Sequence, residues 1–296
     1  MQSTGSERGL ATAIGFSAVL MWALLALFTA ASGKVPPFQL SAMCFAIGGC
    51  IGLTRWISVP QARAALARQP WKAWVLGVGG LFGYHFFYFT ALRNAPAVEA
   101  GLIAYLWPLL IVLFSALLPG ERLAWHHIAG AMLAFAGAAL IVTRGESLDI
   151  DPRYTFGYLA ACVCALTWSG YSVLSRRFAA VPTDVVTGFC LATAILSALC
   201  HVALEETVWP AATREWLAVA GLGLLPVGLA FYAWDHGVKR GDIQLLGVSA
   251  YAAPLLSTIL LIAFGFAPLT WAVVAAAFLV TAGAALAAKD SIRRRP

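Results

Sequence analysis

Tyr105-Leu-Trp-Pro-Leu-Leu110 and Tyr251-Ala-Ala-Pro-Leu-Leu256 are two copies of one segment, 146 residues apart. The same offset aligns further pairs, among them Trp22 with Trp168, Val35-Pro36 with Val181-Pro182, and Leu123 with Leu269. Alanine and leucine matches arise by chance in so apolar a chain, whereas matched tryptophans, tyrosines and prolines are much rarer. We therefore interpret the chain as two repeats, residues 1–146 and 147–296.

Most of the chain is apolar. Hydrophobic residues make up 61% of it and charged residues only 11%, against about 25% charged in soluble domains. We therefore expect lipid to surround most of its surface. A transmembrane helix needs about 20 mostly apolar residues. Ten segments meet this requirement: 10–31, 37–55, 72–92, 97–118, 124–143, 156–175, 184–204, 216–236, 243–265 and 268–288.

The predicted fold is an all-α membrane protein of ten transmembrane helices. An even number of spans places both chain ends on one side. If that side is the cytoplasm, 14 of the 19 lysine and arginine residues lie inside and 5 outside, as the positive-inside rule requires. We predict a multi-pass protein of the bacterial inner membrane with cytoplasmic N and C termini. This placement explains the net charge of +6 without a nucleic-acid partner, for which no motif is present.

Each repeat holds five predicted spans, which is an odd number. The second repeat therefore enters the membrane from the opposite side to the first. Inverted repeats are typical of secondary transporters, in which two similar halves exchange conformations and open the site to alternate sides. We predict transport of a small molecule by alternating access. The alternative is an old duplication that is kept only for packing.

Three tryptophans, Trp22, Trp107 and Trp168, lie near the middle of predicted spans. An indole N–H in the bilayer centre needs a hydrogen-bond partner, which favours a cavity or a helix interface over lipid. Trp22 and Trp168 are repeat mates, so we expect both near the central axis. Seven other tryptophans lie at span ends, as in an interfacial belt.

The third span carries Tyr84, His85 and Tyr88. Tyr84 and Tyr88 share one helix face because they are four residues apart. Ionisable residues inside a membrane mark functional sites, and histidine changes charge near neutral pH. We predict that these three residues bind substrate. The alternative for His85 is a neutral ring that is hydrogen-bonded to a neighbouring helix.

Pro108 and Pro254 are repeat mates in the fourth and ninth spans. A proline removes one backbone donor and crowds the carbonyl four residues earlier. We predict a helix break at both places. Freed carbonyls beside Tyr105 and Tyr251 are then candidates for binding a substrate ammonium group, together with these two side chains. A simple kink is the alternative.

Two acidic residues lie near span ends. We expect each to be solvated or paired, Glu99 with Arg93 and Asp235 with Lys239. The sequence contains no GxxxxGK[ST] loop, no HExxH motif and no GxSxG motif. We therefore predict no cofactor and no metal. The driving force is expected to be the gradient of the substrate itself or a coupled ion such as the proton.

Three segments, Ala104–Phe114, Tyr232–Gly237 and Val248–Tyr251, resemble the drug/metabolite transporter superfamily in its two-repeat EamA form. The resemblance covers nearly the whole chain. It implies a ten-helix basket with a central cavity and export of amino acids from the bacterial cytoplasm. Aromatic walls suit aromatic and other apolar amino acids. The alternatives are a broader drug or metabolite exporter of the same fold and a membrane-embedded enzyme, although only His85 offers deep acid–base chemistry.

Overall fold

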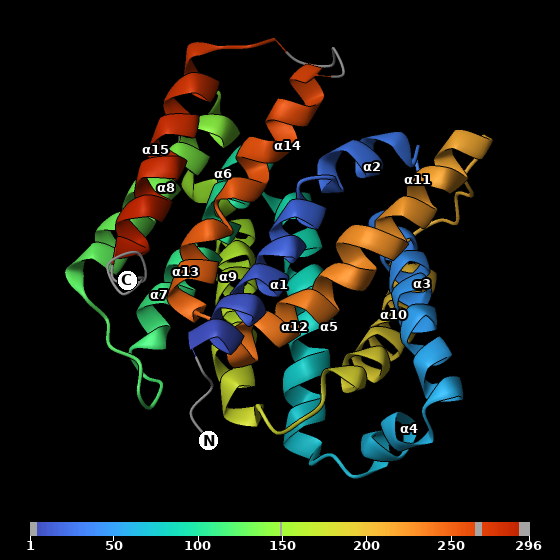
Figure 1. The fold of residues 1–296 in the computed structure, drawn as a ribbon. Coiled ribbons are helices and arrows are strands. Elements are labelled where there is room, and N and C mark those ends of the chain that lie inside the picture. Colours follow the sequence, from blue (N-terminus) through green and yellow to red (C-terminus); the bar gives the residue numbers. More distant parts are fainter. Residues whose placement is uncertain (1–4, 149, 264–267, 290–296) are drawn as a thin grey trace.

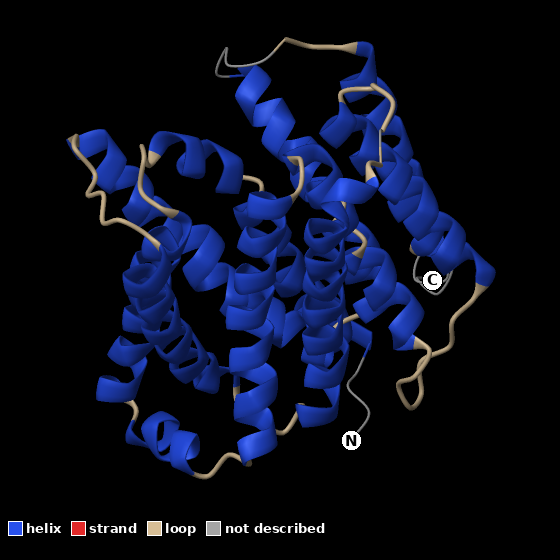
Figure 2. Ribbon diagram, turned by 180° about the vertical axis from the view of Figure 1, so that it is seen from behind, coloured by secondary structure: helices blue, strands red, loops and turns tan. Residues whose placement is uncertain are grey.

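The computed structural model describes residues 5–148, 150–263 and 268–289, and within them the chain forms helices and no strand (Figures 1 and 2). In chain order the helices are α1 (Gly5–Trp22), α2 (Leu25–Ala31), α3 (Pro37–Ser58), α4 (Pro60–Ala67), α5 (Trp71–Asn94), α6 (Ala97–Ala104), α7 (Trp107–Ser115), α8 (Trp125–Thr143), η1 (Pro152–Tyr154), α9 (Thr155–Ser175), η2 (Arg176–Phe178), η3 (Thr183–Val185), α10 (Val186–Leu204), α11 (Thr213–Leu224), η4 (Leu225–Leu229), α12 (Ala230–Arg240), α13 (Ile243–Ser249), α14 (Ala252–Ala263) and α15 (Trp271–Ala287).

Nine helical stretches of this described part are long and apolar enough to cross a membrane. They are Ser6–Ala31, Pro37–Ser58, Trp71–Asn94, Ala97–Ser115, Trp125–Thr143, Pro152–Phe178, Thr183–Leu204, Thr213–Arg240 and Ile243–Ala263. The predicted class, a helical membrane protein, is confirmed. The tenth predicted span corresponds to α15, which is apolar but has only 17 residues. The chain ends and the last two residues of the predicted ninth span lie outside the described residues.

Two spans are interrupted at matching places. The fourth span changes from α6 to α7 at Tyr105 and Leu106, and the ninth from α13 to α14 at Ala250 and Tyr251. Tyr105 and Tyr251 are repeat mates. The physical reason is Pro108 and its mate, because each ring crowds the backbone one turn earlier.

The eighth span contains a wide turn. The five residues of η4 form a π-helix between α11 and α12. Pro226 lies in this turn and cannot donate to the carbonyl one turn before it, so the helix widens locally. The carbonyl of Pro226 accepts the indole N–H of Trp22 at 3.0 Å. The wide turn thus attaches the first span to the eighth.

The helices pack mainly across the two halves of the chain. α1 lies on α12, α3 on α10, α5 on α9, α7 on α13 and α8 on α15. Figure 1 shows α8 and α15 together on one side of the bundle and α3 with α10 on the other. Close approach of α1 and α12 depends on facing glycines, since a Cβ on Gly15 would lie 2.9 Å from the Cα of Gly237.

Most tryptophans predicted for the interfacial belt are exposed on the outside of the bundle, namely Trp71, Trp125, Trp209, Trp216 and Trp271. Trp74 instead turns inward and packs edge-on against Phe189 at 5.4 Å between ring centroids. Trp56 is half-buried and donates its indole N–H to the Asp184 carbonyl. Position at a span end therefore identified an outward-facing side chain in five of seven cases, because a helix end still has an inward face.

Candidate functional site

Four tryptophans from four spans meet in the centre of the bundle. Trp22, Trp107, Trp168 and Trp234 contact one another in all six combinations, with ring centroids 5.0 to 6.4 Å apart. The exposed fraction is 6% for Trp107, 3% for Trp168 and 0% for Trp234. The middle of the predicted central cavity is therefore packed with aromatic rings in this conformation.

Trp234 was missed by the sequence interpretation. Its indole N–H donates to the Ser172 hydroxyl at 3.0 Å, which fixes the ring between α12 and α9. The sequence contained a signal for Trp234, because it lies 146 residues after Tyr88 and is therefore the repeat mate of that residue. The candidate residue of the third span thus has an aromatic repeat mate in the eighth.

The predicted cluster of the third span joins this centre. The ring of Tyr84 lies 5.4 Å from that of Trp168 and stacks on Tyr88 at 6.0 Å with an interplanar angle of 4°. Tyr105 lies close enough to both tyrosines to interact with them electrostatically. Six of the eight predicted binding residues therefore belong to one continuous aromatic group, which His85 joins as the seventh: Trp22, Tyr84, Tyr88, Tyr105, Trp107 and Trp168.

His85 belongs to the same group through its ring contacts. Its centroid lies 5.2 Å from that of Tyr84 and 5.0 Å from that of Phe45. Its Nδ1 lies 2.7 Å from the Leu81 carbonyl, so this nitrogen is assigned the proton, since a carbonyl only accepts. This hydrogen bond lies within α5, since Leu81 is one turn earlier, and not to a neighbouring helix as the alternative for His85 expected. The other ring nitrogen, Nε2, lies on the side of the ring away from this carbonyl.

Tyr251 lies apart from the tryptophans. It is fully buried beside Phe135, and its hydroxyl accepts the backbone N–H of Leu109 at 3.1 Å. Because Leu109 follows Pro108 at the start of α7, this bond joins the two interrupted spans. The Ala250 carbonyl accepts the N–H of Ala253 at 3.1 Å, so it already has one partner. A free carbonyl at Ala104 stays a prediction.

A buried ion pair lies one residue beyond Trp234. Asp235 and Lys239 are 1% and 7% exposed, and their side chains are 2.9 Å apart. The Thr183 hydroxyl also donates to Asp235 at 2.8 Å, and the Lys239 ammonium donates to the Val181 carbonyl at 3.0 Å. The predicted pairing of Asp235 with Lys239 is confirmed, but it is buried and ties α12 to the start of the seventh span.

The predicted pairing of Glu99 with Arg93 is wrong. Arg93 binds Glu205 at the end of α10, at 2.6 Å. The Glu205 carboxylate also accepts the backbone N–H groups of Phe38 and Gln39 at the start of α3, each at 3.1 Å. Backbone donors at a helix N-terminus attract a carboxylate, and Glu205 is 167 residues away in sequence from Phe38. This contact was therefore invisible to reasoning about neighbours along the chain.

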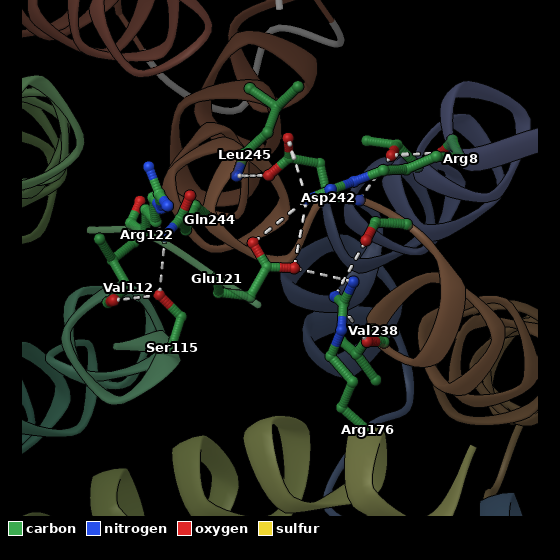
Figure 3. A network of polar contacts seen from close by, with 12 residues as sticks. Arg8, Val112, Ser115, Glu121, Arg122, Arg176, Val238, Asp242, Gln244 and Leu245 are labelled. Carbon is green, nitrogen blue, oxygen red and sulfur yellow. Dashed lines mark hydrogen bonds and ion pairs between the residues drawn. The ribbon is translucent and has the colours of Figure 1, made fainter. Parts of the chain in front are cut away.

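A second network of charged side chains lies at the opposite end of the bundle, where it links several spans (Figure 3). Glu121 binds Arg176 at 3.0 Å and Arg8 at 3.2 Å, and Arg8 lies 3.6 Å from Asp242. Arg176 also donates to the carbonyl of Gly241 at 2.9 Å. Arg8, Glu121 and Arg176 stand at the ends of the first, fourth and sixth spans, which carry Trp22, Trp107 and Trp168, and Asp242 caps the start of the ninth span at α13. We name Arg8, Glu121, Arg176 and Asp242 the end network.

No group of three histidine, cysteine or acidic side chains within the described ranges is arranged to hold a metal ion. The chemistry available in the centre is therefore stacking, apolar contact and hydrogen bonding by tyrosine, tryptophan and histidine.

Residues 9–143 and residues 155–288 each match the sequence model of the EamA-like transporter family. The chain belongs to this family. It is a multi-pass membrane transporter and not an enzyme. The predicted resemblance to the drug/metabolite transporter superfamily is thereby confirmed.

Relatives of this transporter cover nearly its whole length. A protein of Ancylobacter novellus named aromatic amino acid exporter YddG is 58% identical over 95% of this chain and 98% of its own. A Salmonella typhimurium protein of the same name is 27% identical over 93% of this chain and 96% of its own. A crystal structure of a protein that is 56% identical has a TM-score of 0.91 and covers 96% of this chain and 99% of the other.

Proposed function

We propose that this transporter exports aromatic and other apolar amino acids across the bacterial inner membrane by alternating access. The observation that carries the proposal is the contact of four tryptophans from four spans in the centre of the bundle. Flat apolar rings bind apolar and aromatic side chains by stacking. The 58% identical relative, named as an exporter of aromatic amino acids, supports the same substrate class.

We propose ten spans, with α15 as the tenth. At 1.5 Å per residue its 17 residues reach about 26 Å, close to the hydrocarbon thickness of about 30 Å. With ten spans the positive-inside rule favours cytoplasmic N and C termini. The end network then lies on the cytoplasmic side, and Glu205 with Arg93 on the periplasmic side.

We propose that residues 1–146 and 147–296 are inverted repeats. Exchanging the halves turns the pair α1 and α12 into the pair α9 and α5, and it leaves the pairs α3 with α10 and α8 with α15 unchanged. Repeat mates that lie on a twofold axis must contact each other. Trp22 contacts its mate Trp168 at 5.9 Å, and His85 contacts its mate Phe231 at 6.2 Å. Both contacts are expected for residues near such an axis.

The packing of α8 against α15 supports the same symmetry. Gly130 faces the carbonyl of Gly283 so closely that an added Cβ would clash. Their repeat mates are Ala276 and Gly137, and a Cβ on Gly137 would lie 3.0 Å from the Ala276 carbonyl. One close contact is therefore repeated with the halves exchanged.

In the proposed cycle the end network closes the cytoplasmic side. It joins both halves through the pairs of Glu121 with Arg176 and of Arg8 with Asp242. Inward opening must break these pairs, and the inverted relation of the halves allows the periplasmic side to close in exchange. The interrupted spans at Pro108 and Pro254 supply hinges, because broken helices can rotate about the break.

In the proposed site Trp22, Trp107, Trp168 and Trp234 stack on the substrate side chain. Tyr84, Tyr88, Tyr105 and His85 hold its ammonium and carboxylate groups, and carbonyls at the two breaks, the one before Tyr251 included, assist with the ammonium. Transport is driven either by a coupled proton or by the gradient of the substrate itself. In the second case the protein is a facilitator.

Purified protein in liposomes tests the proposal with a panel of labelled tryptophan, phenylalanine, methionine, glutamate and an organic cation. We expect the three apolar amino acids to move, and glutamate and the cation to stay behind. Movement of the cation alone would replace amino-acid export by drug export. Repeating the measurement with a pH gradient decides coupling, since equal rates with and without the gradient would exclude proton exchange.

A further inference from the structure

A hollow of about 230 Å³ lies between α7 and α9, which pack side by side. It is found at the same end of these helices as the end network. Its wall is formed almost entirely by apolar residues: Phe114, Leu117, Leu118, Gly170, Val173 and Leu174. Arg177, in η2 just beyond α9, is the charged residue of its rim.

Water is a poor occupant of this hollow. Its volume equals that of about eight water molecules in the liquid, but the apolar wall offers them few hydrogen-bond partners. Leu117 and Leu174 are 69% and 41% exposed, and on a membrane span such surfaces face lipid. The hollow therefore opens toward the bilayer, and the abundant apolar occupant there is a lipid acyl chain.

Arg177 supplies charge complementarity for the headgroup. Its guanidinium makes one long hydrogen bond, 3.4 Å to the Leu117 carbonyl, and has no carboxylate partner within 4.0 Å among the described residues. The nearby Glu121 is already occupied by Arg8 and Arg176. A guanidinium has five N–H donors in a fork that matches phosphate oxygens. Basic pockets between helices on the cytoplasmic side of a membrane bind anionic lipids.

We propose that this hollow is a binding site for an anionic phospholipid, with one acyl chain between α7 and α9 and the phosphate on Arg177. α7 begins with Trp107, and α9 carries Trp168 two residues before Gly170. The bound chain therefore fills the space between two spans of the tryptophan centre. The proposal concerns lipid and stands whatever substrate the transporter carries.

Two substitutions test the contributions of the acyl chain and of the lipid headgroup separately. Gly170→Leu fills the hollow, because a Cβ at Gly170 meets no other atom within 4 Å. Arg177→Gln removes the charge and leaves the wall intact. Gly79→Leu is the matched control, since Gly79 in α5 has equally open space and lies outside the hollow. Arg63→Gln in α4 controls for loss of an exposed positive charge.

The measurement is binding of phosphatidylglycerol and of phosphatidylcholine with identical acyl chains to the full-length protein in detergent, followed by native mass spectrometry. We expect wild-type protein to retain phosphatidylglycerol preferentially. Arg177→Gln should weaken that lipid at least about fivefold, since one arginine near an anionic lipid contributes about that factor. It should weaken phosphatidylcholine less, because the choline ammonium of that lipid already offsets its phosphate charge. Gly170→Leu should weaken both lipids.

The controls should bind like the wild type. Thermal unfolding without added lipid shows whether each variant is folded, and leucine in place of glycine in a helix is expected to keep it so. Equal retention of the two lipids by the wild type would overturn the proposal. So would unchanged phosphatidylglycerol binding in folded Gly170→Leu and Arg177→Gln proteins.

Discussion

Replacing Glu121 with glutamine removes the shared acid of the end network while keeping the shape of the side chain. Glu121 and Arg176 are only 10% and 18% exposed, and their side chains form an ion pair with nitrogen and oxygen 3.0 Å apart. Breaking such a partly buried pair costs about 2 kcal/mol, between the value for an exposed pair and that for a fully buried one. The pair with Arg8, whose side chain is 41% exposed, adds about 0–1 kcal/mol. Glutamine retains one acceptor oxygen, so we expect the closed cytoplasmic side to lose about 2–3 kcal/mol.

A loss of that size raises the population of the inward-open state about 30- to 150-fold while that state stays the minor one. Ser115 is a suitable reporter position, because it is fully buried and its hydroxyl accepts a hydrogen bond from Gln244 beside the network (Figure 3). In protein lacking the six native cysteines, Ser115→Cys should react with a membrane-impermeant maleimide applied to the cytoplasmic face. We expect Glu121→Gln to raise the labelling rate of Ser115→Cys about 30- to 150-fold.

Glu206→Gln is the matched control, since Glu206 is exposed at the opposite end of the bundle. It should leave the labelling rate unchanged. Equal rates in Glu121→Gln and its parent would refute the role of the network as a closure. An equal increase in both variants would show general loosening and refute it as well.

Three further outcomes follow from the centre of the bundle. Trp168→Leu should lower transport of labelled tryptophan into liposomes by up to about tenfold, since one aromatic contact contributes about 0.5–1.5 kcal/mol beyond burial. Trp209→Leu, at an exposed position, is the control. Undiminished transport by Trp168→Leu would exclude the Trp168 ring from the site. Asp235→Asn leaves a buried ammonium without its carboxylate and should cost about 3–5 kcal/mol of unfolding free energy. Adding Lys239→Met should restore most of that stability. An Asp235→Asn protein as stable as the wild type in detergent would contradict the predicted loss. Trp234→Phe should cost about 1 kcal/mol through its lost hydrogen bond, which unchanged thermal unfolding would disprove.

Features that depend on a few neighbouring residues were predictable from the sequence. Hydropathy over about 20 residues identified nine spans that the structure also contains. The ring of Pro108 acts within one helical turn, so the break before α7 was foreseeable from one position. Asp235 and Lys239 are four residues apart on one helix, and their pairing was predicted for that reason.

The sequence by itself therefore determined the helices, the breaks before Pro108 and Pro254 and the repeat, because these features arise from local chemistry and from one constant offset. The tertiary structure decided which distant residues meet. It brought Trp234 into the aromatic centre, gave Arg93 to Glu205 instead of Glu99, and joined Arg8 to Glu121 across 113 residues. Such partners depend on the rotation of each helix about its axis, which is set by side-chain packing between spans and has no signature within either one.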